Sequence, residues 1–207
     1  MSAPLPPQTP PPIRDACSLI LWRQTTQGPA VLMGQRGAKA QFMPNKFVFP
    51  GGGLDPQDTS SPQNSGLSPR CHRRLGALAD ALISCGLREL QEETGLTLRQ
   101  GAGLHFIFRA ITPRQRPRRF DARFLMADAR DLANPDAPLP NDGELRHLTW
   151  VPLHEARALD LPFVTELVLA EAGALLAAAH RLQDMAPAEG VPFFDNRGPR
   201  PVFSRIC

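Results

Sequence analysis

Three carboxylates crowd the end of a predicted helix in the segment Arg88-Glu89-Leu90-Gln91-Glu92-Glu93-Thr94-Gly95-Leu96. Glu89, Glu92 and Glu93 lie three or four positions apart, so on a helix some of their side chains are neighbours and their like charges repel. The partial negative charge of a helix C-terminus disfavours acidic residues by a further ~0.3–1 kcal/mol each. A bound divalent cation would offset both effects, because hard cations such as Mg²⁺ take carboxylate oxygens as ligands. These three residues are therefore candidate metal ligands.

The residues before this cluster specify the helix that carries it. Apolar residues recur there at three- and four-residue spacing, which predicts one buried stripe. The stripe consists of Leu75, Leu78, Ala79, Leu82, Ile83, Gly86, Leu87 and Leu90. At about 100° per residue, Glu93 continues this stripe, Glu89 lies close beside it and Glu92 lies further round. Gly95 is placed to end the helix in a left-handed conformation.

Length and composition favour one globular domain. A chain of 207 residues with 42% hydrophobic and 21% charged residues is ordinary for such a domain. The net charge of +3 gives no case for bulk nucleic-acid or membrane binding. No apolar run approaches the roughly 20 residues that span a bilayer, and no signal peptide is recognisable at the N-terminus. We expect a cytoplasmic protein with neither a membrane nor a nucleic-acid partner.

The remaining apolar segments predict an α/β fold. Strands are expected at residues 16–22, 30–33, 47–49, 104–110, 122–127 and 148–151, the first two forming a hairpin. Helices are expected at 153–159 and 164–183, and short edge strands at 191–194 and 201–203. These elements give one domain over residues 14–207, preceded by a proline-rich disordered tail at 1–13. Residues 54–74 and 128–143 lack an apolar period and are expected to form a surface insertion and a loop.

Two further clusters are candidates for substrate binding. Gly51, Gly52 and Gly53 follow an apolar run and predict a tight turn or a close approach of the backbone to another group. A basic segment lies between the predicted strands 104–110 and 122–127, and its arginines either bind a phosphate of the substrate or form an ordinary solvated loop. Its arginines are Arg114, Arg116, Arg118 and Arg119.

The cysteines are expected to have a packing role, whereas the aromatic residues are candidates for either packing or ligand binding. The four cysteines show no paired metal-binding spacing, so we expect neither zinc nor a disulfide. Phe42, Phe47 and Phe120 either stack on a nucleotide base or pack in the core.

The segment 88–96 matches at every specified position the second half of the signature of the Nudix hydrolases, and on it the chain resembles that family. Support comes from the residues 49–52 before the helix and 148–152 after it, and the resemblance covers about residues 14–170. Two positions depart from the signature, with Asp80 in place of its glutamate and Arg74 in place of its glycine. The insertion at 54–74 separates the glycine turn from the helix.

The resemblance implies a fold, a metal and a reaction. The fold is a Nudix-type α/β/α sandwich with a mixed central β-sheet, and the metal is Mg²⁺ or Mn²⁺. Glu92 and Glu93 would be ligands, Glu89 a ligand or the general base, and Arg88 would hold Glu92 in place. Members of the family often recruit a further acid from a loop, for which Glu144, with Asp142 beside it, is the candidate.

The implied activity is a diphosphatase that cleaves a nucleoside diphosphate linked to another moiety. Gly51, Gly52, Gly53, Arg116 and Arg119 are expected to bind this substrate. Nucleotide sugars, dinucleotides, NADH, ADP-ribose and coenzyme A derivatives all stay open, as does a homodimer. The alternatives are a catalytically silent nucleotide-binding regulatory module, and a nucleic-acid binder that uses the arginines of 114–119 and would show salt-dependent binding without turnover.

Overall fold

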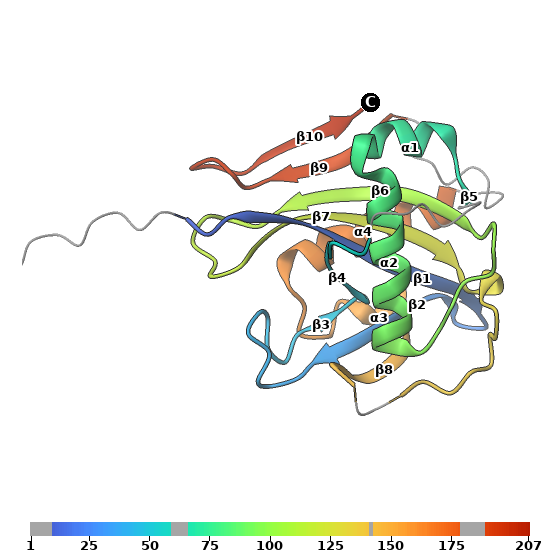
Figure 1. Cartoon of the computed structure of the whole chain (residues 1–207). Helices are drawn as coiled ribbons and strands as arrows, with labels where there is room; N and C mark the ends of the chain where they lie inside the picture. Colours follow the sequence, from blue (N-terminus) through green and yellow to red (C-terminus); the bar gives the residue numbers. More distant parts are fainter. Residues whose placement is uncertain (1–9, 59–65, 141–142, 179–188) are drawn as a thin grey trace, which may run out of the picture.

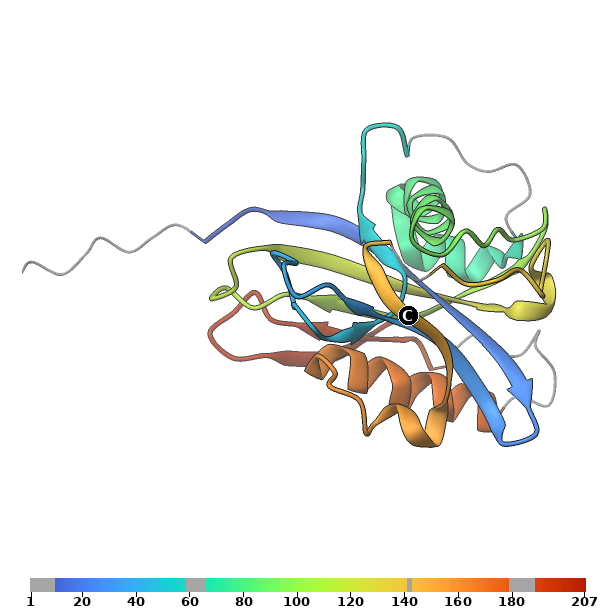
Figure 2. The same ribbon diagram turned by 90° about the horizontal axis from the view of Figure 1, so that it is seen from below.

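The computed structural model of the chain describes residues 10–58, 66–140, 143–178 and 189–207. Within these ranges a mixed β-sheet lies between helices on its two faces (Figures 1 and 2). The predicted α/β/α sandwich is confirmed.

The sheet combines parallel and antiparallel pairs. Its strands are β1 (Ile13–Thr25), β2 (Gly28–Arg36), β3 (Phe47–Val48), β4 (Gly51–Gly53), β5 (Gly66–Leu67), β6 (Gly103–Ile111), β7 (Arg119–Asp128), β8 (Leu145–Pro152), β9 (Val191–Asp195) and β10 (Val202–Ile206). The order along the sheet is β10-β9-β6-β7-β1-β2-β3, with β4 beside β1, β5 beside β6 and β8 beside β2. Strand β1 runs antiparallel to β2, which confirms the predicted hairpin, and parallel to β7.

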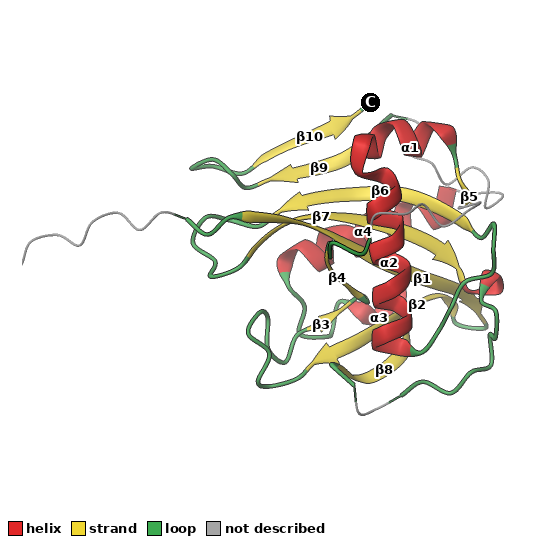
Figure 3. Cartoon of the chain, viewed as in Figure 1, coloured by secondary structure: helices red, strands yellow, loops and turns green. Residues whose placement is uncertain are grey.

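The helices are divided between the two faces of the sheet. They are α1 (Pro69–Leu75), α2 (Ala79–Thr94), α3 (Leu153–Ala156) and α4 (Phe163–Ala178). Helix α2 crosses one face, whereas α3 and α4 lie against the other (Figures 2 and 3). None of the helices in the described ranges combines the length and apolar character that a membrane span requires.

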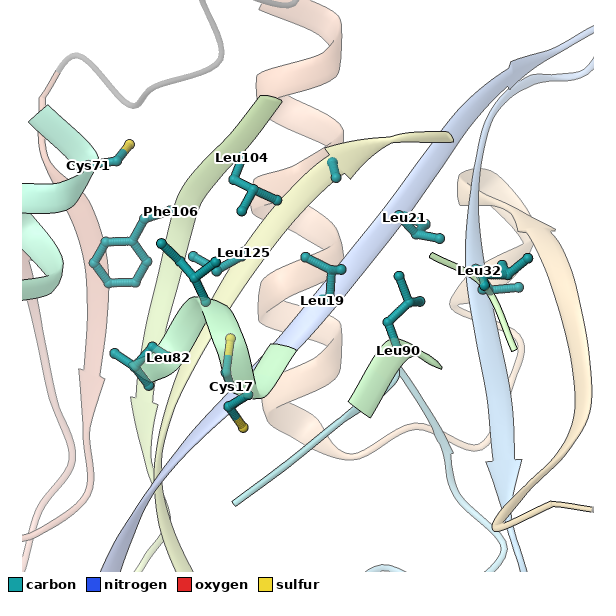
Figure 4. Close-up of a cluster of buried hydrophobic side chains, with 14 of the residues drawn as sticks. Cys17, Leu19, Leu21, Leu32, Cys71, Leu82, Leu90, Leu104, Phe106 and Leu125 are labelled. Atoms are coloured by element: carbon teal, nitrogen blue, oxygen red, sulfur yellow. The ribbon is translucent and has the colours of Figure 1, made fainter. Parts of the chain in front are cut away.

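Strand β1 lies at the centre because both of its faces are apolar. Cys17 and Leu19 pack in the cluster beneath α2, part of which Figure 4 shows, whereas Ile20 and Trp22 pack in the cluster beneath α4. Successive side chains of a strand point to opposite faces, so a strand covered on both sides reads as a continuous apolar run. The run at residues 16–22 is explained by this position.

The predicted apolar stripe does not lie on one continuous helix, because its first residue, Leu75, ends α1 and its residues from Ala79 on lie in α2. A short 3₁₀ turn over Gly76–Leu78 separates α1 from α2, and α2 then ends at Gly95, whose φ of 70° is left-handed as predicted. The Gly95 N–H donates to the carbonyl of Gln91, which satisfies one free group at the helix end. The carboxylates at the end of α2 thus have the predicted helical placement.

The expectation of an irregular insertion over 54–74 is wrong at its C-terminal end. The Ser68 hydroxyl accepts a hydrogen bond from the Cys71 N–H and starts α1, with Pro69 in the first turn. Cys71 and Leu75 are buried. The helix was not predicted, because it contains three arginines and a histidine and buries only these two residues. Residues 59–65 lie outside the described residues.

The remaining expected elements overlap observed ones, with shifts of their ends, and the helix expected at 153–159 is the shorter α3, which ends at Ala156. Strand β1 begins at Ile13, so the proposed tail of residues 1–13 ends one residue too late, and residues 1–9 lie outside the described part of the chain. The helix expected over 164–183 is observed as α4, and residues 179–183 lie outside the description. The expected edge strands are β9 and β10.

Candidate active site

The glycine cluster forms a strand, not the turn that its composition favours. Gly51, Gly52 and Gly53 pair antiparallel with Ser18, Cys17 and Ala16 of β1, and this strand, β4, contacts α2. The alternative expectation, a close backbone approach, is met: a Cβ atom on Gly52 would lie 2.5 Å from Cδ of Glu89. The absence of side chains lets α2 bring its carboxylates against the β4 backbone.

Glu93 lies inside the interface between α2 and β4. Only 5% of its surface is exposed, and its carboxylate accepts a hydrogen bond of 2.8 Å from the Gly51 N–H. Burial raises the pKa of Glu93 to about 8, an effect opposed by the Gly51 hydrogen bond and supported by the nearby charges of Glu89 and Glu144. One N–H group is little compensation for a buried carboxylate charge.

Arg88 ties three carboxylates together. Its Nη1 atom donates to Glu89 at 2.8 Å and to Glu92 at 3.1 Å. Its Nε and Nη2 atoms donate to the two oxygens of Asp58 at 3.0 and 2.9 Å. The predicted contact with Glu92 is therefore present, and Asp58 is a partner that sequence reasoning missed. Burial raises the pKa of Glu89, while the Arg88 guanidinium acts in the opposite direction.

The glycines and two of the carboxylates line a pocket of about 730 Å³. The acidic residues on its wall are Glu89, Glu93 and Glu144, and the basic ones are Arg14, Arg36, Lys46, Arg116 and Arg118. Aromatic side chains line it as well, namely Phe42, Phe49, Phe120, Phe124, Phe163 and Phe194. Such a pocket joins acid, cation and aromatic surface in one site, which suits a molecule with phosphates and a flat apolar part.

The other candidate residues divide into those at the pocket and those away from it. Glu144 is 62% exposed and pairs with Arg36 at 2.7 Å, and Arg116 lines the pocket. Glu92 is 58% exposed and lies outside the lining, held by Arg88. Arg119 also lies outside it, because its buried side chain donates to the backbone carbonyls of Thr112 and Pro11. Asp142 is outside the described residues.

The aromatic candidates separate in the same way. The Phe42 and Phe120 rings meet edge to face at 5.4 Å on the pocket wall. Phe47 packs against the core cluster beneath α4. All four cysteines are free, with Cys17, Cys71 and Cys85 buried, and burial raises the pKa of the Cys85 thiol to about 12. The expectation of no disulfide agrees with this arrangement.

The carboxylates fit a hard cation by their chemistry, but their present arrangement does not converge. Within the described ranges no three His, Cys, Asp or Glu residues gather closely enough to hold a metal ion. Glu93 faces the Gly51 N–H, whereas Glu89 and Glu92 face Arg88. The buried Glu93 and the half-buried Glu89, both with raised pKa values, and the exposed Glu92 nevertheless supply the oxygen donors that Mg²⁺ and Mn²⁺ prefer.

Residues 12–172 match the sequence profile of a known family, described as the NUDIX domain. The chain belongs to the Nudix family. Over 83 residues it is 39% identical to a Caenorhabditis elegans protein assigned as nudix hydrolase 7, a match that covers 40% of this chain and 22% of that protein. The matched segment thus spans about a fifth of the length of this relative.

Solved structures share the Nudix fold at low sequence identity. A NUDIX hydrolase from Alicyclobacillus acidocaldarius has a TM-score of 0.62 and 22% identity over 85% of this chain and 99% of its own. The NUDIX domain of Shewanella oneidensis NrtR, complexed with ADP ribose, has a TM-score of 0.51 and 15% identity over 80% and 90%. A C. elegans Ap4A hydrolase in a binary complex has a TM-score of 0.51 and 18% identity over 80% and 100%.

The contact between the Nudix helix and β4 predicts opposite outcomes for two neighbouring glycines. In Gly52→Ala the new methyl group displaces the flexible Glu89 carboxylate, and we expect kcat to fall about 100-fold with a small change in stability. In Gly51→Ala the methyl group would lie 2.5 Å from the Cys17 carbonyl, which is backbone, so we expect a loss of about 1–3 kcal/mol in unfolding free energy. Steady-state kinetics and urea unfolding measure the two effects, and equal behaviour of the two variants would contradict them.

Glu93 predicts a pH dependence of stability in metal-free protein. Its folded pKa of about 8 exceeds the ordinary value of 4.5, so the folded state binds more protons between these two pH values. The unfolding free energy should therefore fall as pH rises through this window, by at most about 1.4 kcal/mol per pH unit for this one group. Glu93→Gln removes the titrating group, and urea unfolding between pH 5 and pH 8 should show a shallower slope for the variant. An unchanged slope would assign the dependence to other groups.

Proposed function

We propose that the protein is a metal-dependent hydrolase that cleaves a nucleoside diphosphate linked to another moiety. The observation that supports this most is the pocket wall on which Glu89 and Glu93 meet the side-chain-free backbone of Gly51 and Gly52, opposite basic and aromatic side chains. Carboxylates at one end serve a metal and a water, cations bind phosphate, and rings accept a base. Membership of the Nudix family adds to this support.

The proposed metal is Mg²⁺ or Mn²⁺, and Glu89, Glu92 and Glu93 would hold it. When bound, such a cation neutralises phosphate charge and lowers the pKa of a coordinated water. Glu92 is the carboxylate with the freedom to turn toward it, since it is mostly exposed and forms a surface ion pair with Arg88. Glu144, on the same pocket wall, is the proposed additional acid.

The remaining steps fall to the chain's own side chains. The hydrogen bond from Arg88 holds one carboxylate oxygen of Glu89 beside the β4 backbone. The other oxygen of Glu89 is proposed to accept a proton from the attacking water. Burial raises the pKa of Glu89 above its ordinary value, which makes its carboxylate a stronger base. Arg14 and Arg116 are the proposed contacts for the phosphates. Arg118 takes the place that the sequence assigned to Arg119.

A hydrolysis screen tests this function. The protein is incubated with ADP-ribose, NADH, diadenosine tetraphosphate, a nucleotide sugar and coenzyme A, each with Mg²⁺, with Mn²⁺ and with a chelator. We expect release of a mononucleotide or phosphate-ester product from at least one of them, only in the presence of metal. The C. elegans Ap4A hydrolase and the ADP-ribose complex of the NrtR domain motivate two of these choices.

A silent nucleotide-binding module is the second candidate, because the NUDIX domain of NrtR is complexed with ADP ribose. It predicts binding of the same compounds without turnover. Calorimetric binding of ADP-ribose with no product after prolonged incubation with Mn²⁺ would favour this candidate over the enzyme. A homodimer and a cytoplasmic location stay predictions of the sequence.

A further inference from the structure

A second, strongly basic pocket opens beside the candidate active site. Its volume is about 500 Å³, and four cationic side chains line it, those of Arg36, Lys39, Arg118 and Arg146. Glu144 supplies the one carboxylate on its wall. Since Arg36, Arg118 and Glu144 line both pockets, the two pockets adjoin each other. Among the described residues, the lining of the second pocket therefore carries three more positive than negative charges, next to the carboxylates of α2.

Within the described residues, most of this positive charge has no compensating carboxylate. Glu144 pairs with Arg36, and Arg118 donates to the side-chain carbonyl of Gln41, which is neutral. Across the described ranges Lys39 and Arg146 form no ion pair, and the buried Nε atom of Arg36 has no hydrogen-bond partner there. Buried donors are normally satisfied, and clustered cations repel one another. An anion bound between them would remove both costs.

A β-bulge places Arg146 in this pocket. Strands β2 and β8 shift register between Met33, which faces Thr149, and Gln35, which faces Arg146. His147 absorbs the extra residue with a φ of 51°, a left-handed conformation that residues with a side chain seldom adopt. With unbroken pairing, Gln35 would face His147. Arg146 and Leu145 would then each point to the face of the sheet opposite to the one that they occupy.

The bulge also settles which side chains enter the core. Leu145 is fully buried against Gly34, where a Cβ atom would lie 2.8 Å from the Leu145 Cβ. Its neighbours Glu144 and Arg146 point the other way and line the basic pocket. The strained conformation of His147 and the glycine at position 34 thus accompany an arrangement in which Glu144 and Arg146 line the same pocket.

We propose that the basic pocket binds a phosphate group of the substrate other than the two phosphates of the hydrolysed diphosphate. This proposal rests on the proposed function and narrows it to nucleoside diphosphate derivatives that carry an additional phosphate monoester. Such a group holds up to two negative charges at neutral pH, and arginine forks and a lysine ammonium are its usual partners. Of the three cations confined to the larger pocket, Arg14 and Arg116 stay available for the diphosphate, whereas Lys46 pairs with Asp160.

Two pairs of nucleotides that differ by one phosphate test the proposal. NADPH is compared with NADH, and coenzyme A with 3′-dephospho-coenzyme A, by steady-state kinetics with Mg²⁺ and by calorimetric titration. We expect the phosphorylated member of at least one pair to have a kcat/KM at least about tenfold higher and a correspondingly lower Kd, as charge-assisted hydrogen bonds to one phosphate predict. In Lys39→Gln/Arg146→Gln this ratio should approach one, while the unphosphorylated member keeps its kcat/KM within about twofold.

The matched control is Arg70→Gln/Arg157→Gln, which removes the same charge from exposed positions outside both pockets and should keep the wild-type ratio. Equal kcat/KM and Kd values within both pairs for the wild-type protein would overturn the proposal. So would a parallel loss for both members in the Lys39/Arg146 variant, since that would place the shared diphosphate in the basic pocket. Absence of turnover with a preserved, variant-sensitive preference in Kd would instead overturn the enzymatic function and leave the phosphate site supported.

Discussion

Glu92→Gln is expected to lower kcat for the true substrate by about a thousandfold, while the melting temperature stays within a few degrees of the wild-type value. The amide keeps the size of the side chain and removes the negative charge that a metal ligand needs. Stability should change little, because the side chain is 58% exposed and its contact with Arg88 is a surface ion pair worth up to about 1 kcal/mol.

Glu155→Gln is the matched control for this experiment. Glu155 is equally exposed, at 58%, and also has one ionic neighbour, His154, but it lies on α3 on the other face of the sheet. Its replacement should leave kcat unchanged. Raising the Mn²⁺ concentration should restore part of the activity of Glu92→Gln if the lost charge weakens metal binding. Wild-type turnover by Glu92→Gln would remove this residue from the proposed ligand set.

The acidic end of α2 could be predicted because helical geometry is local. Spacing alone placed Glu93 on the buried stripe and Glu92 further round, and the structure finds the first buried and the second exposed. The left-handed end at Gly95 follows equally from the residue type. Such features depend on neighbours within one turn, which the sequence shows directly.

The burial of Arg119 follows from a local pattern, the alternation of side chains along β7. Alternate residues of β7, namely Phe120, Ala122 and Phe124, line the pocket, so the odd-numbered residues of this strand face the opposite side of the sheet. A strand that starts at Arg119 rather than Ala122 would have predicted its burial. The apolar run at 122–127 did not indicate the start of this strand, because the strand begins with charged residues. The charged residues at 119, 121 and 123 can be buried because they pair with one another or with the backbone.

Two features could not be predicted because they depend on contacts distant in the sequence. Asp58 lies 30 residues before Arg88, in a segment without periodicity, and nothing local marks it as buried. The β-bulge at His147 depends on the register between β2 and β8, which are more than 100 residues apart. Distant pairing of this kind fixes the positions of Asp58, Glu144 and Arg146 in space.

Arg88→Met is expected to reduce the unfolding free energy by about 3–5 kcal/mol, because it leaves the Asp58 carboxylate buried without its cation. Asp58 is 3% exposed and would keep the N–H of Asp55, at 2.8 Å, as a neutral hydrogen-bond donor in place of the arginine. Arg88→Lys keeps the charge but cannot form the two-pronged hydrogen bond, so we expect an intermediate loss. Urea unfolding at pH 7 measures all three proteins.

The Asp58→Asn/Arg88→Met double variant separates this ion pair from the other contacts of Arg88. Removal of both charges should recover much of the stability lost in Arg88→Met, giving a coupling energy of at least about 1 kcal/mol in the double-mutant cycle. No recovery would assign the loss to the contacts with Glu89, Glu92 and the Gly53 carbonyl.

Acid unfolding gives the same pair a second, independent test. Hydrogen bonds from Arg88 lower the folded pKa of Asp58 below its ordinary value of 3.8. The carboxylate therefore contributes stability that is complete above pH 3.8 and is lost as pH falls through the lower folded pKa. Without Arg88, burial of Asp58 favours its protonated form, so the variant should lose less stability on acidification than the wild-type protein. The unfolding free energies of the two proteins should accordingly converge toward low pH, and a gap that stays constant down to pH 3 would mean that Arg88 stabilises the fold through groups other than Asp58.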